Sequence, residues 1–341
     1  MNKQQKNFHR PLYKRSKFAL PYPRSRIPVW CYRFIRGISK KNPCNLSYAP
    51  QQLVLNDIIP ETSLCFIGDI MELKERNLHV GESVKDFVQG ANYVIGNFEA
   101  TITKENRIFM DQRHKEQILD ALEALFDPQR TYLSLANNHT GDFGRKIFKK
   151  SLEKIQQRGF QIFGLKPRPY CDLEEKIRVI GGSMWSNRPC NYIINFYNTP
   201  TYLKQGFFNI LYPHWGYELY LYPNKKYFNI AQEYIQQFDA ILGHHAHVPQ
   251  PIVYEQINDT KKLLAYSLGD FSYGDEEKTN LYHYKYGMIV KIAIGPDSEG
   301  NMKIGKVEWQ FLESQKCSED AFQVELTSHI PKLNLGIENG I

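Results

Sequence analysis

Six short apolar segments of this chain each run directly into a cluster of polar side chains, and this repeated pattern limits the available folds more than any other feature. Apolar runs this short, bounded by glycine and polar residues, predict buried strands. In layered α/β folds, ligands bind just beyond the carboxyl ends of such strands. We therefore expect polar side chains that lie far apart in the sequence to meet at one edge of a sheet. The six junctions are Leu64–Ile67 with Gly68-Asp69, Tyr93–Ile95 with Gly96-Asn97-Phe98-Glu99, Thr131–Leu135 with Asn137-Asn138-His139, Phe208–Tyr212 with His214-Trp215-Gly216, Ala240–Leu242 with Gly243-His244-His245-Ala246-His247, and Lys262–Leu268 with Gly269-Asp270.

Amphipathic helices are predicted between these strands. Apolar residues recur at helical spacing in three sets, which are Ile118, Leu122 and Leu125; Phe143, Ile147, Phe148, Leu152 and Ile155; and Tyr227, Ala231, Tyr234, Ile235 and Phe238. Gln161–Phe163 and Arg178–Ile180 are further strand candidates, and Tyr286–Ala293 and Met302–Leu312 are expected to be antiparallel strands that close a sheet. Alternating strands and helices favour an α/β layered fold.

The charge of the chain divides it into a basic leader and an acidic body. The first 56 residues hold twelve of the 43 Lys and Arg residues and none of the 36 Asp and Glu, so this segment carries +12 and the remainder about −5 of the net charge of +7. We predict a basic, aromatic, proline-rich and largely irregular segment over 1–56, with one short helix near Val29–Ile38, a domain over 57–320 and a C-terminal tail over 321–341. No nucleic-acid-binding module accompanies the charge, so specific nucleic-acid binding is not expected.

The sequence favours a soluble cytoplasmic protein. No apolar run approaches the roughly 20 residues that span a bilayer, and no signal peptide is recognised. The six cysteines are scattered without CxxC spacing, which is typical of buried thiols in a reducing compartment. The basic aromatic segment over 1–50 is expected either to lie on the anionic inner face of the membrane or to serve as a solubilising leader.

The side chains at the six junctions are those that bind divalent metal ions. Asp, Glu, Asn and His without Cys suit Mn²⁺, Fe or Zn²⁺, as one ion or two. A pair of such ions can activate water and hold both oxygens of a phosphoryl displacement. Each motif also has a structural alternative: Gly68-Asp69 can be a turn, Asn137 can form an Asx turn, and His214 can be a core histidine. The three histidines of His244-His245-Ala246-His247 favour a metal or catalytic role more strongly.

Taken in order, the motifs resemble the CapA family of poly-γ-glutamate capsule biosynthesis proteins, whose fold is related to the calcineurin-like metallophosphoesterases. The resemblance covers about residues 62–275. It is carried by Gly68-Asp69, Asn97-Phe98-Glu99, Leu135-Ala136-Asn137-Asn138-His139 with Asp142 and Gly144, His214-Trp215-Gly216 with Glu218, Gly243-His244-His245-Ala246-His247, and Tyr266-Ser267-Leu268-Gly269-Asp270-Phe271.

The resemblance implies a four-layer α/β/β/α sandwich with a metal centre at the strand ends. The implied metal ligands are Asp69, Glu99, Asn138, His214, His245 and His247. Which two of His244, His245 and His247 bind metal stays open, although the spacing of His245 and His247 resembles the phosphoesterase motif better. His139 would be the general acid that protonates a leaving oxygen.

The chain departs from the family pattern in three places. Met71 stands where metallophosphoesterases usually carry a histidine, a loss that CapA proteins commonly share. Asp270 replaces the usual asparagine of the last motif, and the basic leader replaces the membrane anchor or signal of many members.

Together these features predict a metal-dependent hydrolase that acts on a phosphoester or on a γ-glutamyl or other amide-linked polymer in capsule or poly-γ-glutamate biosynthesis. The alternative is a non-catalytic polymer-handling or synthase-associated protein of capsule or exopolysaccharide production, with capsule synthase subunits as partners. In that version Glu218, Trp185, Trp215 and the tyrosine-rich stretch Tyr212–Tyr222 would line a groove for an anionic polymer.

Overall fold

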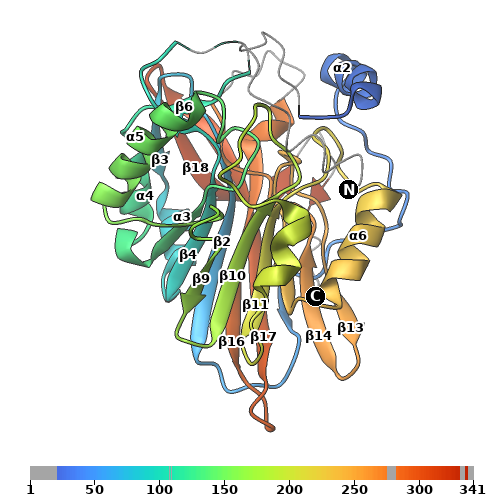
Figure 1. Cartoon of the computed structure of the whole chain (residues 1–341). Helices are drawn as coiled ribbons and strands as arrows, with labels where there is room; N and C mark the ends of the chain where they lie inside the picture. The colour runs from blue at the N-terminus through green and yellow to red at the C-terminus, as the bar shows by residue number, and fades with distance from the viewer. Residues whose placement is uncertain (1–20, 107, 109, 275–281, 331–334, 337–341) are drawn as a thin grey trace.

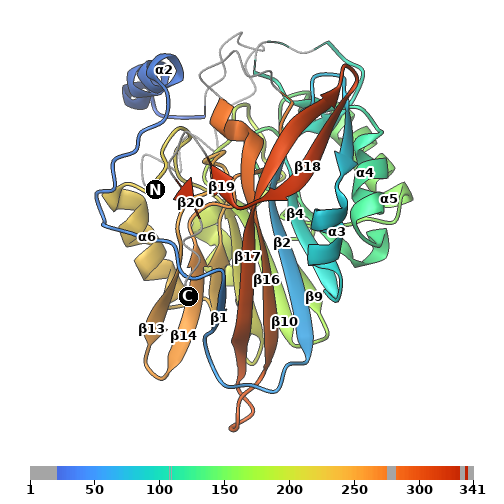
Figure 2. The same ribbon diagram turned by 180° about the vertical axis from the view of Figure 1, so that it is seen from behind.

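Two β-sheets packed face to face form the centre of the molecule (Figures 1 and 2). The computed structural model describes residues 21–106, 108, 110–274, 282–330 and 335–336 of the 341-residue chain. The first sheet has the strand order β3-β18-β17-β16-β2-β4-β7-β8, and the second has the order β13-β14-β12-β11-β10-β9.

The first sheet is mixed, because its parallel strands continue into an antiparallel set. It consists of β2 (Thr62–Ile70), β3 (Asn77–Val80), β4 (Tyr93–Phe98), β7 (Thr131–Ser134), β8 (Gln161–Phe163), β16 (Tyr286–Pro296), β17 (Met302–Ser318) and β18 (Ala321–Thr327), with β1 (Gln52–Val54) beside β17 and β15 (Asp270–Ser272) beside β2. β2, β4, β7 and β8 run parallel in sequence order, whereas β16 pairs antiparallel with both β2 and β17.

The second sheet is built around a set of parallel strands and has antiparallel edges. It consists of β9 (Tyr170–Leu173), β10 (Ile177–Ser183), β11 (Phe208–His214), β12 (Ala240–Leu242), β13 (Ile252–Ile257) and β14 (Thr260–Ala265). β10, β11, β12 and β14 are parallel neighbours, and β9 and β13 flank them in antiparallel pairing.

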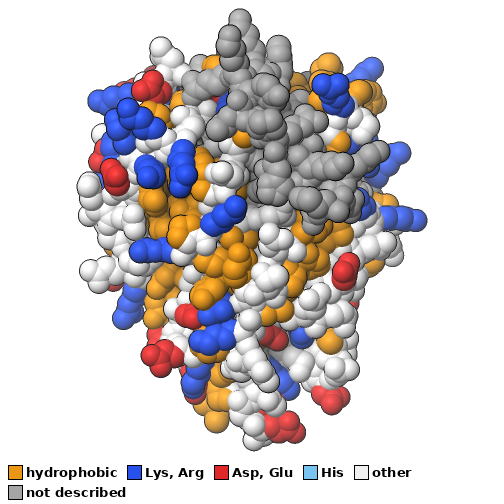
Figure 3. Space-filling model, in the orientation of Figure 1, with side chains coloured by type: hydrophobic (Ala, Val, Ile, Leu, Met, Phe, Trp, Pro, Cys, Tyr) orange, Lys and Arg blue, Asp and Glu red, His pale blue; other side chains and the backbone are white. Residues whose placement is uncertain are grey.

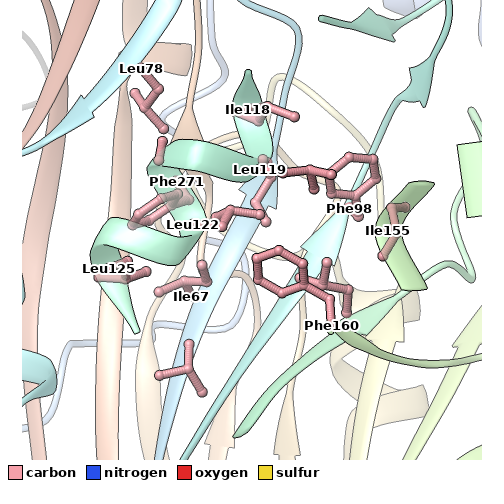
Figure 4. Close-up of a cluster of buried hydrophobic side chains, with 14 of the residues drawn as sticks. Ile67, Leu78, Phe98, Ile118, Leu119, Leu122, Leu125, Ile155, Phe160 and Phe271 are labelled. Carbon is pink, nitrogen blue, oxygen red and sulfur yellow. The ribbon is translucent and has the colours of Figure 1, made fainter. Parts of the chain in front are cut away.

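Helices cover the outer faces of both sheets, which confirms the predicted four-layer α/β/β/α sandwich. α3 (Glu82–Val88), α4 (Ile118–Leu125) and α5 (Gly144–Gln157) lie on the first sheet, and α6 (Lys225–Ile235) lies with the 3-10 helix η3 (Phe196–Tyr202) on the second. Successive strand residues face opposite sides, so Leu64 and Phe66 enter the core between the sheets while Cys65 and Ile67 face the helices. Figure 4 shows this outer core, in which Ile67 of β2 and Phe98 of β4 belong to one cluster with Leu119 and Leu122 of α4.

The eight strand candidates and three helices predicted from the sequence are all present; β8 and β12 have the predicted ends, and the ends of the others are shifted. The C-terminal strands differ in position: β16 and β17 occupy the middle of the first sheet instead of closing it. The sheet also continues past residue 320, where we placed the domain boundary, because β18 folds back on β17 and pairs on its other side with β3.

Part of the predicted irregular leader is ordered against the body. The 3-10 helix η1 (Arg24–Arg26) leads into α2 (Ile27–Arg36), where we expected a short helix, and β1 adds to the first sheet. Residues 1–20 lie outside the described residues. Among the described residues, no helix is both long and apolar enough to cross a membrane.

Candidate metal centre

The strand ends of both sheets bring the six predicted metal ligands together. Asp69, Glu99 and Asn138 lie at or just after the ends of β2, β4 and β7 of the first sheet, and the histidines lie at the ends of β11 and β12 of the second. Each of these side chains is buried, with at most 2% of its surface exposed. Five of them, all but Asn138, form four overlapping donor sets together with His244 and Glu218. Within each set the ligand atoms lie within 4.8 Å of one another: Asp69, His214 and His244; Glu99, His214 and His245; Glu218, His245 and His247; and Asp69, Glu99 and His247.

Asn138 joins the centre through a direct contact with one of the histidines. Its Oδ1 lies 2.6 Å from Nε2 of His214. Burial, together with the neighbouring histidines, lowers the pKa of His214 well below its usual value, so this imidazole is neutral. A neutral imidazole is the form that binds a metal ion.

Asp69 anchors one side of this centre. Its Oδ1 lies 3.0 Å from Nδ1 of His244 and accepts a 2.7 Å hydrogen bond from Asn97, while its Oδ2 accepts the backbone N–H of His245 at 2.8 Å. Burial raises the pKa of Asp69, but His244 and His247 outweigh it and hold that pKa well below its usual range. The carboxylate is therefore ionised and already oriented toward the imidazoles.

Glu99 carries a buried oxygen that lacks a hydrogen-bond partner among the described residues. This atom, Oε1, lies 3.4 Å from Nε2 of His214 and 3.8 Å from Nε2 of His247. Burial, together with the charges of Asp69 and Asp270, raises the pKa of Glu99 well above its usual value. A positive charge beside Oε1 would give this oxygen a partner and would lower the pKa of Glu99.

Further unpartnered atoms show that the residues present fit a divalent cation. Nε2 of His244, Nδ1 of His245 and Oδ2 of Asp270 are buried and lack hydrogen-bond partners in the described part of the chain. Leaving such groups unpaired in a protein interior costs about 1–3 kcal/mol each. Imidazole nitrogens and carboxylate oxygens are the donors that Zn²⁺, Mn²⁺ and Fe accept.

His247 is held by Asp270, the residue that replaces the usual asparagine. Nδ1 of His247 lies 2.7 Å from Oδ1 of Asp270. Burial alone would lower the pKa of His247, but the charge and hydrogen bond of Asp270 raise it to about 9, while burial raises the pKa of Asp270 to about 7. A carboxylate behind a histidine is the arrangement that orients imidazole ligands in metal sites.

His139 is oriented in the same way by a second carboxylate. Its Nδ1 lies 2.6 Å from Oδ2 of Asp142, and the side chain of Asn187 approaches the same ring at 3.1 Å. Asn187 also accepts from Asn138, so it ties His139 to a predicted ligand. Only 4% of His139 is exposed. The contact with Asp142 fixes the ring and leaves Nε2 as the nitrogen available for proton transfer.

Neighbouring residues take structural roles that the sequence left open. Asn137 forms the Asx-type turn: its Oδ1 accepts the backbone N–H of His139 at 3.1 Å and the hydroxyl of Thr140 at 2.9 Å. Trp185 and Trp215, proposed as groove residues, are 4% and 3% exposed and belong to the core beneath α6. All three histidines of the His244–His247 loop belong to at least one donor set, so the geometry brings His244 in beside the other two.

Sequence reasoning missed two members of the site. Glu218 was noted in the motif set but not as a donor, although it joins His245 and His247 in one set. Tyr22, in the N-terminal segment, places its hydroxyl 2.9 Å from His245. The only available signal for Glu218 was its place four residues after His214, and no local pattern singles out Tyr22.

The fold and the donor sets define a class of protein: a four-layer α/β/β/α sandwich with a candidate metal centre where the strands of both sheets end. The profile of the family described as "Bacterial capsule synthesis protein PGA_cap" matches residues 63–181 and 201–274. This chain belongs to that family.

Two curated relatives agree with this assignment. The PGA biosynthesis protein CapA of Bacillus subtilis (strain 168) is 27% identical over 243 residues, which cover 61% of this chain and 62% of that protein. The capsule biosynthesis protein CapA of Bacillus anthracis is 25% identical over 251 residues, which cover 61% and 59%. The match thus spans about three fifths of each relative's length.

Solved structures of other proteins resemble the chain more distantly. A hypothetical protein from Thermus thermophilus aligns with a TM-score of 0.45 and 12% identity over 74% of this chain and 99% of that chain. A putative 5'-nucleotidase from Staphylococcus aureus, solved in complex with α-ketoglutarate, aligns with a TM-score of 0.42 and 12% identity over 73% of this chain and 54% of that chain.

Proposed function

We propose that this protein is a metal-dependent hydrolase in capsule or poly-γ-glutamate production, acting on a phosphoester or on a γ-glutamyl or other amide-linked polymer. The observation that carries the proposal is the set of unpartnered buried donors on Glu99, His244 and His245 beside a carboxylate-held His139. The biosynthetic context comes from the family and from the printed names of the two relatives.

The residues divide into those that would hold the ion and one that would move a proton. Asp69, Glu99, Asn138, His214, His245 and His247 would hold one or two ions of Mn, Fe or Zn. Such ions supply Lewis acidity toward phosphoryl or carbonyl oxygens. His139 would deliver a proton from Nε2 to the leaving oxygen or nitrogen, while Asp142 keeps the other ring nitrogen protonated.

Elemental analysis of the purified protein, joined to a substrate panel, tests this proposal. The panel contains a generic phosphodiester and a γ-glutamyl peptide. We expect at least one bound divalent ion, and turnover that falls about 10²- to 10⁴-fold in His139→Ala, the usual contribution of a general acid. His79→Ala is the matched control, because His79 is an exposed histidine on β3. Absence of metal, with His139→Ala and His245→Ala both equal to wild type, would contradict the proposal.

The burial of the proposed metal ligands favours a second candidate function. All six proposed ligands are buried, and Tyr22 covers His245. A non-catalytic protein that handles an anionic polymer beside a capsule synthase would have the same metal without turnover. Co-purification with synthase subunits, together with bound metal and no hydrolysis of any panel member, would establish this version.

A peripheral contact with anionic membrane through the N-terminal segment also remains a proposal. α2 supports it, because Val29, Tyr32 and Ile35 are 36%, 55% and 67% exposed on a helix whose last turn contains Arg33 and Arg36. The outer surface of α2 carries apolar and basic side chains together (Figure 3).

A further inference from the structure

Tyr22 reaches from the N-terminal segment into the metal centre. It is only 5% exposed, and its ring packs edge-on against Trp185 and Tyr217 at centroid distances of 5.0 and 5.2 Å and lies 6.0 Å from the ring of His245. Tyr22 lies outside the residues that the family profile matches, which begin at residue 63. The contact therefore comes from a part of the chain that the family profile does not match.

Hydrogen bonds within α2 and directly after it hold the N-terminal segment on the body, which fixes the position of Tyr22. After the helix, Ser39 exchanges two backbone hydrogen bonds with the segment that carries Glu218: its N–H donates to Leu219 at 2.9 Å, and its carbonyl accepts from Leu221 at 2.9 Å. Within the helix, Trp30 donates its indole N–H to Glu218 at 3.0 Å.

The hydrogen bonds around the phenol leave one consistent assignment of protons. The hydroxyl of Tyr22 lies 2.9 Å from Oε1 of Glu218 and 2.9 Å from Nε2 of His245, and it accepts the backbone N–H of Glu218 at 3.1 Å. The phenol has a single hydrogen to donate, and this hydrogen points to Oε1 of Glu218, whose other oxygen, Oε2, accepts the indole N–H of Trp30. The phenol therefore donates to Glu218, and Nε2 of His245 must carry the hydrogen that it shares with the phenol oxygen.

This assignment determines which nitrogen of His245 is available to a metal ion. A neutral imidazole carries its hydrogen on one nitrogen and a lone pair on the other. With Nε2 protonated, the lone pair belongs to Nδ1. That atom is buried and has no hydrogen-bond partner among the described residues, and His245 shares a donor set with Glu99 and His214.

We propose that Tyr22 is a positioning residue of the metal centre, whose phenol oxygen fixes His245 in its Nε2–H form and so presents the Nδ1 lone pair to the ion. The chain Glu218–Tyr22–His245 repeats, with a phenol inserted, the carboxylate–histidine arrangement of Asp270 and His247. The proposal deepens the proposed function, since it rests on a metal ion binding at this centre.

The first experiment reads the tautomer directly and requires no metal. In metal-free protein labelled with ¹⁵N-histidine, long-range ¹H–¹⁵N spectra distinguish a protonated nitrogen from one with a lone pair, and His245→Gln identifies the signals of His245. We expect the Nε2–H form in wild type and its loss or a mixture of forms in Tyr22→Phe. Tyr32→Phe, which removes a phenol that is half exposed in the same segment, should match wild type.

The second experiment measures Zn²⁺ affinity by competition with a chromophoric chelator. We expect Tyr22→Phe to bind about 10- to 100-fold more weakly, the usual effect of removing the partner of a metal-binding histidine, with an unchanged circular dichroism spectrum. An Nδ1–H form of His245 in wild type, or wild-type affinity in Tyr22→Phe, would overturn the role of Tyr22. Failure of wild type itself to bind Zn²⁺, Mn²⁺ or Fe²⁺ would instead overturn the proposed function, while the spectra would still decide the tautomer.

Discussion

The loop that carries His245 and His247 places both residues in backbone conformations that few side chains adopt. Their φ angles are +96° and +55°, in the region that normally favours glycine. Such conformations cost about 1–3 kcal/mol each and persist where the surroundings enforce them. Here the enforcing contacts are the bond from the backbone N–H of His245 to Asp69 and the pairing of His247 with Asp270.

His114 is a buried histidine outside the metal centre that should contribute to the loss of stability in mild acid. It is 3% exposed, its Nε2 lies 3.1 Å from the carbonyl oxygen of Ile70, and burial lowers its pKa to about 4. In the unfolded chain its pKa is about 6.5. Because the unfolded state binds the proton first, folding stability is complete above about pH 6.5 and decreases as the pH falls toward 4.

We therefore predict that His114→Gln, which keeps a hydrogen-bond donor for Ile70, weakens this dependence. Between pH 7 and pH 4.5 the wild type should lose about 2–3 kcal/mol more unfolding free energy than the variant. Urea denaturation at both pH values measures the difference. Parallel losses in the two proteins would show that His114 is protonated equally in the folded and unfolded states.

At the scale of elements, the strand ends could be read from the sequence because glycine and polar residues follow apolar runs. β2 nevertheless extends through Gly68 and Asp69 to Ile70, beyond the predicted Leu64–Ile67. The reason is tertiary: β15 pairs with the end of β2, and a Cβ at Gly68 would lie 1.9 Å from the carbonyl oxygen of Gly269. Gly68 allows this contact, which no local pattern reveals.

A pair of glycine substitutions tests that explanation. In Gly68→Ala the new methyl group would meet backbone, whereas in Gly90→Ala it would enter open space at a φ of +79°. Gly90→Ala should cost only the left-handed strain of about 1–2 kcal/mol, and we expect Gly68→Ala to cost clearly more. Thermal or urea unfolding of both variants gives the comparison. Equal losses would mean that β15 moves aside at no significant cost.

α2 is the element through which membrane contact can be tested. Basic residues near an anionic surface contribute about 1 kcal/mol each, and the exposed apolar side chains would enter the interface. We predict that full-length protein sediments with phosphatidylserine vesicles but not with phosphatidylcholine vesicles, and that the double substitution Val29→Ser and Ile35→Ser weakens this binding. Ile59→Ser is the control, because Ile59 is an exposed apolar residue, at 72%, outside the helix. Equal sedimentation of control and double variant would exclude α2 as the contact.

At the scale of the molecule, the candidate centre joins the two sheets. Asp69 and Glu99 belong to the first sheet and its strand ends, while His214, His245 and His247 belong to those of the second. An ion bound by both groups would oppose separation of the sheets, because it binds the folded state and has no comparable site in the unfolded chain.

Metal should therefore raise the melting temperature of the whole protein. At a free Zn²⁺ or Mn²⁺ concentration 100-fold above the dissociation constant, the stabilisation is about 2.7 kcal/mol. Differential scanning fluorimetry with added metal and with EDTA measures this effect. His214→Ala should remove the metal-dependent shift, whereas His79→Ala should keep it. A shift of equal size in His214→Ala would place the stabilising ion elsewhere.

The sequence predicted those parts of the whole that depend on local pattern. Strand ends, amphipathic helices and the histidine cluster are short-range signals, and they indicated an α/β layered fold with metal-binding side chains at the strand ends, whereas the four layers and the six candidate ligands came from the resemblance to the CapA family. The central position of β16 depends instead on pairing with β2, more than 200 residues earlier in the chain. The entry of Tyr22 likewise depends on where the N-terminal segment crosses the second sheet, so neither was predictable from sequence pattern.

The contact between Tyr22 and His245 also sets an order of events during synthesis. The two residues are 223 positions apart, and at 5–20 residues per second the ribosome needs roughly 10–45 s to travel between them. During that interval Asp69 and Glu99 have emerged without their histidines, and β2 still lacks its neighbour β16. The centre can therefore be completed only after synthesis has passed His247, so that an ion bound there would be captured long after Asp69 and Glu99 have been made.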